Sequence, residues 1–191
     1  GVDDYVIIED ADILSPTDIT VELWIKQPEL LDGRNYYINK SDGNSGAEYA
    51  LLQSGPPSFG VNTAVSQLVG NSSNYFETNL EPITNEWTHL AFTYNSLIDS
   101  TEFFFNGQSV GKKYIDGEIE NTNGIMCIGA YVPYSTPTLN YNNFTGMIDE
   151  IRISNISRYS ENFNPNINFE SDINTIAHYN FNAGSGNILY D

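Results

Sequence analysis

The segment Asp18-Ile19-Thr20-Val21-Glu22-Leu23-Trp24-Ile25-Lys26 has an aliphatic side chain at every second position. A strict period of two is typical of a β-strand that buries one face and turns the other towards polar surroundings. The four aliphatic side chains share one face, and Trp24 lies on the opposite face among polar residues. The segment therefore predicts a half-buried β-strand.

The same period of two recurs along the chain and predicts further strands. These are residues 4–9, 35–40, 48–53, 86–94, 101–106, 124–130, 145–154 and 175–181. Turn sequences rich in Gly, Asn, Asp and Pro separate them, and Asn106-Gly107 predicts a hairpin after the strand 101–106. No apolar stripe with helical spacing extends over several turns. We expect one all-β domain, residues 1–191, folded as a two-sheet antiparallel β-sandwich of the jelly-roll type.

The composition excludes several classes of partner. The chain has 7 Lys and Arg against 25 Asp and Glu, which gives a net charge of −18. Nucleic-acid binding depends on clustered basic residues, so we expect no nucleic-acid partner. No apolar run is long enough to span a bilayer, so we expect no membrane insertion. The one cysteine, Cys127, excludes an internal disulfide and lies in an apolar run that predicts a buried, inert thiol.

Five short segments, in this order, resemble those of LamG-like jelly-roll domains, a branch of the concanavalin A-like lectin/glucanase superfamily. They are GVDDYV at 1–6, ITVELWIK at 19–26, EWTHLAFTY at 86–94, FNG at 105–107 and GMIDEIRIS at 146–154. The resemblance covers nearly the whole chain and implies a concanavalin A-like jelly roll. This fold hosts sugar-binding modules, glucanases, adhesion domains and viral surface domains, so the function has to be argued from a site.

Asp149 is a candidate metal ligand. The period of two places its carboxylate on the same face as three apolar side chains of the strand 145–154, where an unpaired charge is costly. Calcium accepts carboxylate and amide oxygens and would compensate for that charge. Resemblance to laminarinase-type glucanases implies that Asp149 ligates a structural Ca²⁺, with Asn182 as a partner ligand. The alternative is that Asp149 caps backbone amides or pairs with Arg152.

The sequence offers little for catalysis. Glucanases of this fold carry a Glu-x-Asp-x-Glu motif, and the nearest match, Asp116–Glu120, has its acidic residues in a different order directly after a hairpin. We interpret it as a solvated acidic edge. His89 and His178 lack metal-ligand spacing, and we expect His89 to be a packed strand histidine. We therefore expect no enzymatic activity, and a glycoside hydrolase is the weakest alternative.

A binding site is better supported than a catalytic one. Sugars stack on aromatic rings and hydrogen-bond to amides, and the irregular segment 131–143 is rich in both kinds of side chain. The alternative is that its tyrosines only cover the edge of the sandwich. The predicted ligand-binding residues are Tyr131, Tyr134, Asn140, Tyr141 and Asn142, with Tyr36, Tyr37 and Tyr75 as further candidates. A second long irregular segment, residues 157–174, is also of the kind that carries binding residues.

From these features we expect a non-catalytic, secreted recognition module that binds carbohydrate through loop tyrosines and amides. The alternative is a protein-binding adhesion or structural module of a cell-surface or viral fibre protein. The expected partner is thus a glycan or a cell-surface protein, and the expected location is extracellular or on the cell surface, within a larger secreted or virion protein.

Overall fold

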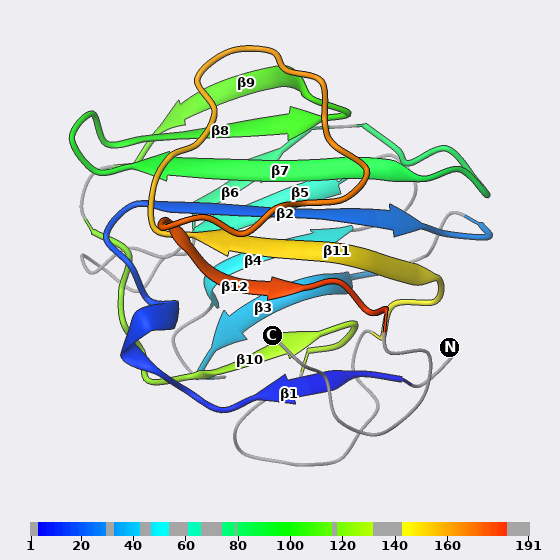
Figure 1. The fold of residues 1–191 in the computed structure, drawn as a ribbon, viewed down its shortest axis with the longest axis horizontal. Coiled ribbons are helices and arrows are strands. Elements are labelled where there is room, and N and C mark those ends of the chain that lie inside the picture. The colour runs from blue at the N-terminus through cyan, green and yellow to red at the C-terminus, as the bar shows by residue number, and fades with distance from the viewer. Residues whose placement is uncertain are drawn as a thin grey trace.

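The computed structural model describes residues 4–29, 33–42, 47–53, 61–65, 74–78, 80–115, 118–131 and 143–182, with only the backbone at 61–65 and 74–77. In these residues the strands form two six-stranded antiparallel sheets (Figure 1). The first sheet has the order β1 (Val6–Ile8), β10 (Ile125–Ile128), β3 (Asn35–Ser41), β4 (Ala47–Gln53), β5 (Val61–Val65), β6 (Asn74–Glu77). The second sheet has the order β12 (Thr175–Tyr179), β11 (Met147–Ser154), β2 (Ile19–Lys26), β7 (Thr88–Asn95), β8 (Ser100–Phe105), β9 (Gln108–Tyr114).

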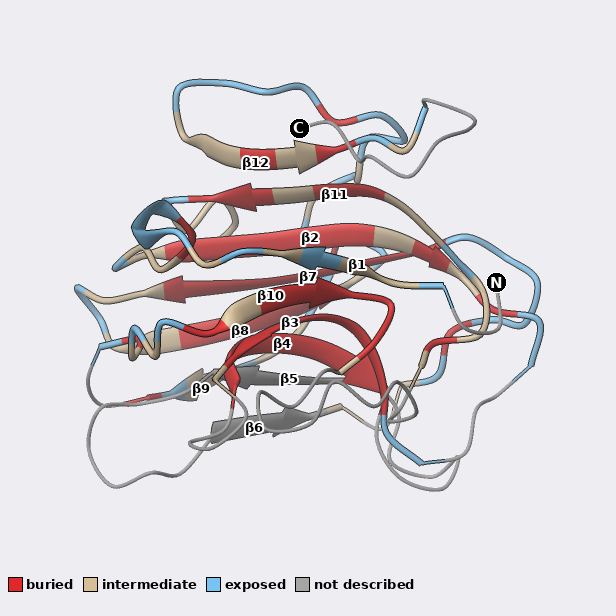
Figure 2. Ribbon diagram, turned by 90° about the horizontal axis from the view of Figure 1, so that it is seen from below, coloured by how far each residue is buried: buried red, intermediate tan, exposed pale blue. Residues whose placement is uncertain are grey.

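The two sheets pack face to face around one apolar core, which confirms the all-β sandwich. Ile19, Val21, Leu23 and Ile25 of β2 are fully buried in that core, as their alternation predicts. Figure 2 shows that burial is concentrated in the central strands and that exposed residues lie mainly in the connections. Cys127 is buried in β10. Within the described ranges, the only helical element is a short 3₁₀ turn at Asp12–Leu14, and no helix there could cross a membrane.

All nine predicted strands are present. The predicted hairpin is confirmed between β8 and β9, where Asn106 and Gly107 have φ angles of 50° and 72°, as a type I′ turn requires. Sequence reasoning missed β5 and β6. Gly107 has a second constraint, since a Cβ atom there would collide with the carbonyl oxygen of Phe163.

The segment 155–174 lies across the outer face of the second sheet, and we call it the covering loop. Figure 1 shows it in orange, crossing the strands between β2 and β9. Its Phe163 N–H donates to the Gly107 carbonyl at 2.9 Å, and its Asn162 side chain accepts from the Ser109 N–H at 2.8 Å. The rings of Tyr159 and Phe163 stack with centroids 3.6 Å apart. The covering loop therefore buries a face that the sequence pattern assigns to polar surroundings.

Strand β11 contains a bulge that corrects one prediction. Its register with β2 shifts between Asp149 and Arg152, and Glu150 has a φ angle of 53°. A bulge inserts a residue and reverses the alternation on one side of it. Asp149 pairs with Trp24 and lies on the outer face, whereas Ile151 is in the core. The prediction that the carboxylate points towards the core is wrong.

Candidate functional site

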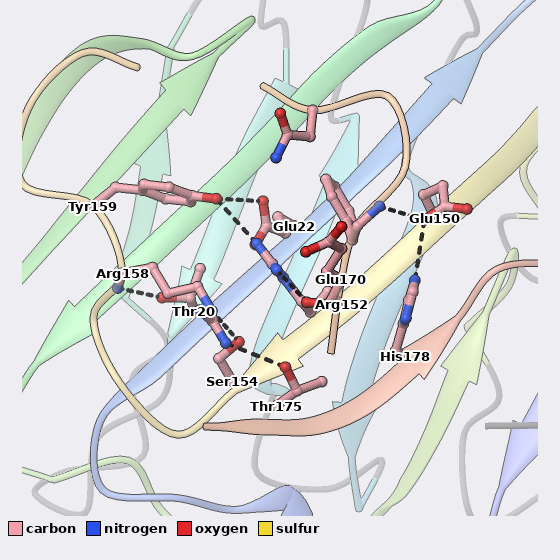
Figure 3. A network of polar contacts seen from close by, with 12 residues as sticks. Thr20, Glu22, Glu150, Arg152, Ser154, Arg158, Tyr159, Glu170, Thr175 and His178 are labelled. Atoms are coloured by element: carbon pink, nitrogen blue, oxygen red, sulfur yellow. Dashed lines mark hydrogen bonds and ion pairs between the residues drawn. The ribbon is translucent and has the colours of Figure 1, made fainter. Parts of the chain in front are cut away.

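A buried network of charged groups lies between β2, β11 and the covering loop (Figure 3). Its centre is the fully buried side chain of Glu22, whose Oε1 accepts hydrogen bonds from Arg152 Nε at 2.9 Å and Nη2 at 2.7 Å. Its Oε2 accepts from the Tyr159 hydroxyl at 2.9 Å and lies 3.3 Å from His89 Nε2. Burial by itself would raise the pKa of Glu22, but the hydrogen bonds and charges of His89 and Arg152 outweigh it and lower that pKa.

The same network fixes the covering loop at both ends of its path. Arg152 Nη1 donates to the Glu170 carbonyl at 2.9 Å, and its guanidinium lies 4.8 Å from the ring centre of Phe169. Glu150 Oε2 accepts from the Phe169 N–H at 2.8 Å and contacts His178 Nε2 at 3.0 Å. These groups hold the loop against the sheet and are covered by it. We conclude that they are structural and that His89 is a packed strand histidine, as expected.

At the edge of the covering loop the outer face opens into a pocket of about 250 Å³, which we call the tryptophan pocket. Its lining residues are Trp24, Trp87, Asp149, Glu150 and Ile167. The indole N–H of Trp24 donates to the carbonyl of Asn166 at 3.0 Å, and its ring meets His89 edge-on at 5.2 Å. The first ring is therefore fixed by the covering loop.

The other walls of the tryptophan pocket come from three separate parts of the chain. Trp87 directly precedes β7 and is 41% exposed, and Ile167 belongs to the covering loop. Asp149 accepts a hydrogen bond from the N–H of Glu150 at 2.9 Å. Burial raises the pKa of Asp149, the Glu150 N–H opposes this shift, and the Glu150 charge adds to it. Two aromatic faces beside a carboxylate acceptor suit a ligand with C–H faces and hydroxyl groups.

Of the predicted tyrosine site, the structure describes Tyr131, which lies on the opposite outer face of the sandwich. Tyr131 stacks on Tyr36 with ring centroids 5.0 Å apart, in a small apolar cluster on β3 and β4. Tyr37 is buried in the core, so its prediction as a ligand contact is wrong. The remaining predicted residues, Tyr134, Asn140, Tyr141 and Asn142, lie outside the described residues, as does the side chain of Tyr75.

The predicted calcium ligands lie at one end of the second sheet. Strands β11 and β12 are antiparallel and Ile151 pairs with Tyr179. The chain that follows β12 to Asn182 therefore continues towards the end of β11 at which Asp149 lies. Calcium takes about six to eight oxygen ligands. The described residues contain no group of three or more acidic, histidine or cysteine side chains that could hold a metal ion. Calcium also accepts amide and backbone carbonyl oxygens, so the ion stays a prediction from the resemblance.

The predicted acidic edge is described only in part. Glu118 is exposed and Ile119 packs into the core, while residues 116 and 117 lie outside the described ranges.

Sequence reasoning did not identify the tryptophan pocket. One signal was available, because Trp24 stands on the polar face of an alternating strand, where a large aromatic ring is unusual. No sequence signal brings Ile167 to Trp24, since 143 positions separate them in the chain. Their proximity depends on the docking of the covering loop.

Sequence comparison defines the family. The pattern of the concanavalin A-like lectin/glucanase superfamily matches residues 1–162, and the chain belongs to this superfamily. No curated protein sequence matches the chain.

Solved structures share the fold at low sequence identity. A protein of Bacteroides ovatus proposed to bind carbohydrate superposes with a TM-score of 0.70 at 16% identity, over 91% of this chain and 48% of that one. The sialidase CBM40 domain of Ruminococcus gnavus, solved with α2,3-sialyllactose, gives 0.56 at 12% identity, over 80% of this chain and 91% of that one. A SAP-like pentraxin of Limulus polyphemus gives 0.57 at 14% identity, over 76% and 67%. These similarities establish the jelly-roll fold, and the chain spans about half the length of the first protein.

Proposed function

We propose that the chain is a carbohydrate-recognition module and that the tryptophan pocket holds the sugar. The observation that carries this proposal is the pairing of Trp24 and Trp87 with the carboxylate of Asp149 in one preformed hollow. Indole faces pack against the C–H face of a sugar ring, and a carboxylate accepts hydrogen bonds from its hydroxyl groups. The sugar-binding names of two structural neighbours support the same class of ligand.

The size and rigidity of the pocket favour a small, rigid ligand. Its volume of about 250 Å³ is just below the roughly 300–1,000 Å³ of common small-molecule sites, which suits one sugar ring better than a whole glycan. Trp24 is held by Asn166, and Glu150 by Phe169 and His178. Binding therefore immobilises few groups of the protein that were free before, which lowers the entropic cost of association.

The arrangement favours binding over hydrolysis. A retaining glycosidase places two carboxyl groups about 5 Å apart on either side of the bond that it cleaves. Here Asp149 and Glu150 are adjacent in the chain, and Glu150 Oε2 already accepts the Phe169 N–H and contacts His178. We therefore propose a non-catalytic module that acts extracellularly or at a cell surface, where glycans are displayed, as part of a larger protein.

A glycan array with the wild-type chain and two matched variants tests the proposal. Trp87→Ala removes a half-exposed ring from the proposed site, and Tyr131→Ala removes the described tyrosine of the predicted site on the opposite face. We expect Trp87→Ala to lose binding to the glycans that the wild type captures and Tyr131→Ala to keep it. Unchanged melting temperatures show that both variants fold.

The reverse result, with binding lost only in Tyr131→Ala, would overturn the tryptophan pocket in favour of the tyrosine loop. A wild-type chain that binds no glycan, but binds a purified cell-surface protein, would support the adhesion alternative.

A further inference from the structure

A second pocket of about 250 Å³ lies next to the tryptophan pocket, and we call it the lysine pocket. Its lining residues are Lys26, Pro28, Asn85, Thr145, Gly146 and Met147. No residue of this pocket belongs to the buried charge network.

The two pockets are built from the same strands, one step apart. Lys26 follows Trp24 by two positions in β2, and Met147 precedes Asp149 by two positions in β11. Side chains two positions apart point to the same face of a strand and are separated by about 6.6 Å. The register pairs Lys26 with Met147 and Trp24 with Asp149, so both pairs lie on the outer face.

The segment before β7 also contributes one residue to each pocket, again two positions apart. Asn85 precedes Trp87 by two positions, and its N–H donates to the carbonyl of Gln27 at 2.8 Å. This hydrogen bond holds the segment before β7 against the end of β2. The two pockets therefore adjoin each other along the strand direction, at a spacing that linked sugar rings can follow.

Lys26 is unusual among the few basic residues of the chain. Lys40, Lys112, Arg152 and Arg158 each form an ion pair. The side chain of Lys26 forms no ion pair or hydrogen bond with the described residues, yet it lines a pocket on a protein of net charge −18. An acidic protein has many carboxylates that could pair with a lysine, so an ammonium group that pairs with none of the described ones suits a negatively charged ligand group.

The charges also determine which of the two pockets favours an acidic sugar residue. Asp149 and Glu150 repel an anionic group from the tryptophan pocket, whereas the ammonium of Lys26 attracts one to the lysine pocket. We propose that the two pockets bind neighbouring residues of one acidic glycan. A neutral sugar residue occupies the tryptophan pocket and a linked sugar residue bearing a carboxylate or a sulfate occupies the lysine pocket. This proposal rests on the proposed function and specifies its ligand.

The test compares matched neutral, uronic-acid and sulfated disaccharides by isothermal titration at 50 mM and 500 mM NaCl. Wild-type protein is expected to bind an acidic disaccharide about tenfold or more tightly than its neutral counterpart at 50 mM, the effect of one charge-assisted hydrogen bond. Lys26→Met keeps the length of the side chain without its charge and should remove this preference while keeping the neutral affinity. Lys26→Arg should retain the preference, and high salt should reduce it.

The uronic-acid and sulfated probes show which acidic group the pocket selects. Equal affinity of the wild type for neutral and acidic disaccharides, or an unchanged preference in Lys26→Met, would overturn the proposal. Both of these results leave carbohydrate binding intact, whereas failure of the proposed function itself would appear as no binding of any disaccharide. The melting temperature of Lys26→Met should equal that of the wild type, because the lysine makes no ion pair with the described residues.

Discussion

Replacing Arg152 with methionine should test how strongly the buried network holds the covering loop. The guanidinium donates two hydrogen bonds to Glu22 and one to the Glu170 carbonyl, and it contacts the Phe169 ring. Methionine keeps much of the side-chain volume and removes the charge and all of the donors. The variant therefore leaves Glu22 buried with His89 and Tyr159 as its remaining partners.

The expected loss follows from the burial of the pair. The side chain of Glu22 is 0% exposed and that of Arg152 is 12% exposed. Breaking a buried ion pair by removing one partner costs about 3–5 kcal/mol, because the other charge stays in a medium of low polarity. For a chain of this size each kcal/mol lowers the melting temperature by about 2–4 °C, so we expect a decrease of roughly 6–20 °C.

Urea unfolding at pH 7 measures the loss, and Lys112→Met is the matched control. Lys112 pairs with Glu102 at 2.9 Å; the Glu102 side chain is only 6% exposed, but that of Lys112 is 54% exposed and water screens its charge, so its removal should cost less than the removal of Arg152. The double variant Glu22→Gln/Arg152→Met should be more stable than Arg152→Met alone, because no uncompensated charge remains buried. A loss in Arg152→Met no larger than that in Lys112→Met would refute the reasoning.

The other predictions concern acid and calcium. Because the pKa of Glu22 is lower in the folded protein than its ordinary value of 4.5, the stability that it contributes is present above that value and is lost as the pH falls through the folded pKa. The melting temperature of the wild type should therefore fall more steeply below pH 4.5 than that of Glu22→Gln, and parallel curves would contradict this assignment. The calcium ligation implied for Asp149 predicts that EDTA lowers the melting temperature and that Asp149→Asn abolishes the effect; a wild-type protein indifferent to both EDTA and added Ca²⁺ would exclude the ion.

The sequence predicts the strands well because local patterns determine them. The alternation around Val21 and Leu23 specifies the buried face of β2, and Asn106-Gly107 specifies the turn between β8 and β9 through the positive φ angles that these residues tolerate. The bulge in β11 has no such signal, since the residue with a φ angle of 53° is Glu150 and not glycine. A single inserted residue there reversed the predicted direction of Asp149.

The site was harder to predict because it depends on long-range docking. Segment 157–174 contains few apolar residues and is irregular, as its sequence predicts, but its aromatic rings pack onto a face that the pattern of β2 marks as polar. Glu22 and His89 become buried through this contact, and Ile167 comes to lie beside Trp24. Alternation with a period of two shows which face of a strand is the more apolar, but it does not show when a distant loop covers the more polar face.

We propose that sugar binds in the pocket that both tryptophans line, and these two side chains provide a fluorescent probe for it. Trp24 and Trp87 are the only tryptophans in the sequence, and both line the pocket. The most direct measurement is therefore a titration of the wild-type chain with a glycan captured on the array, followed by tryptophan fluorescence. We predict that the emission shifts in parallel with binding measured by calorimetry. Saturating glycan binding that leaves the tryptophan emission unchanged would contradict the claim.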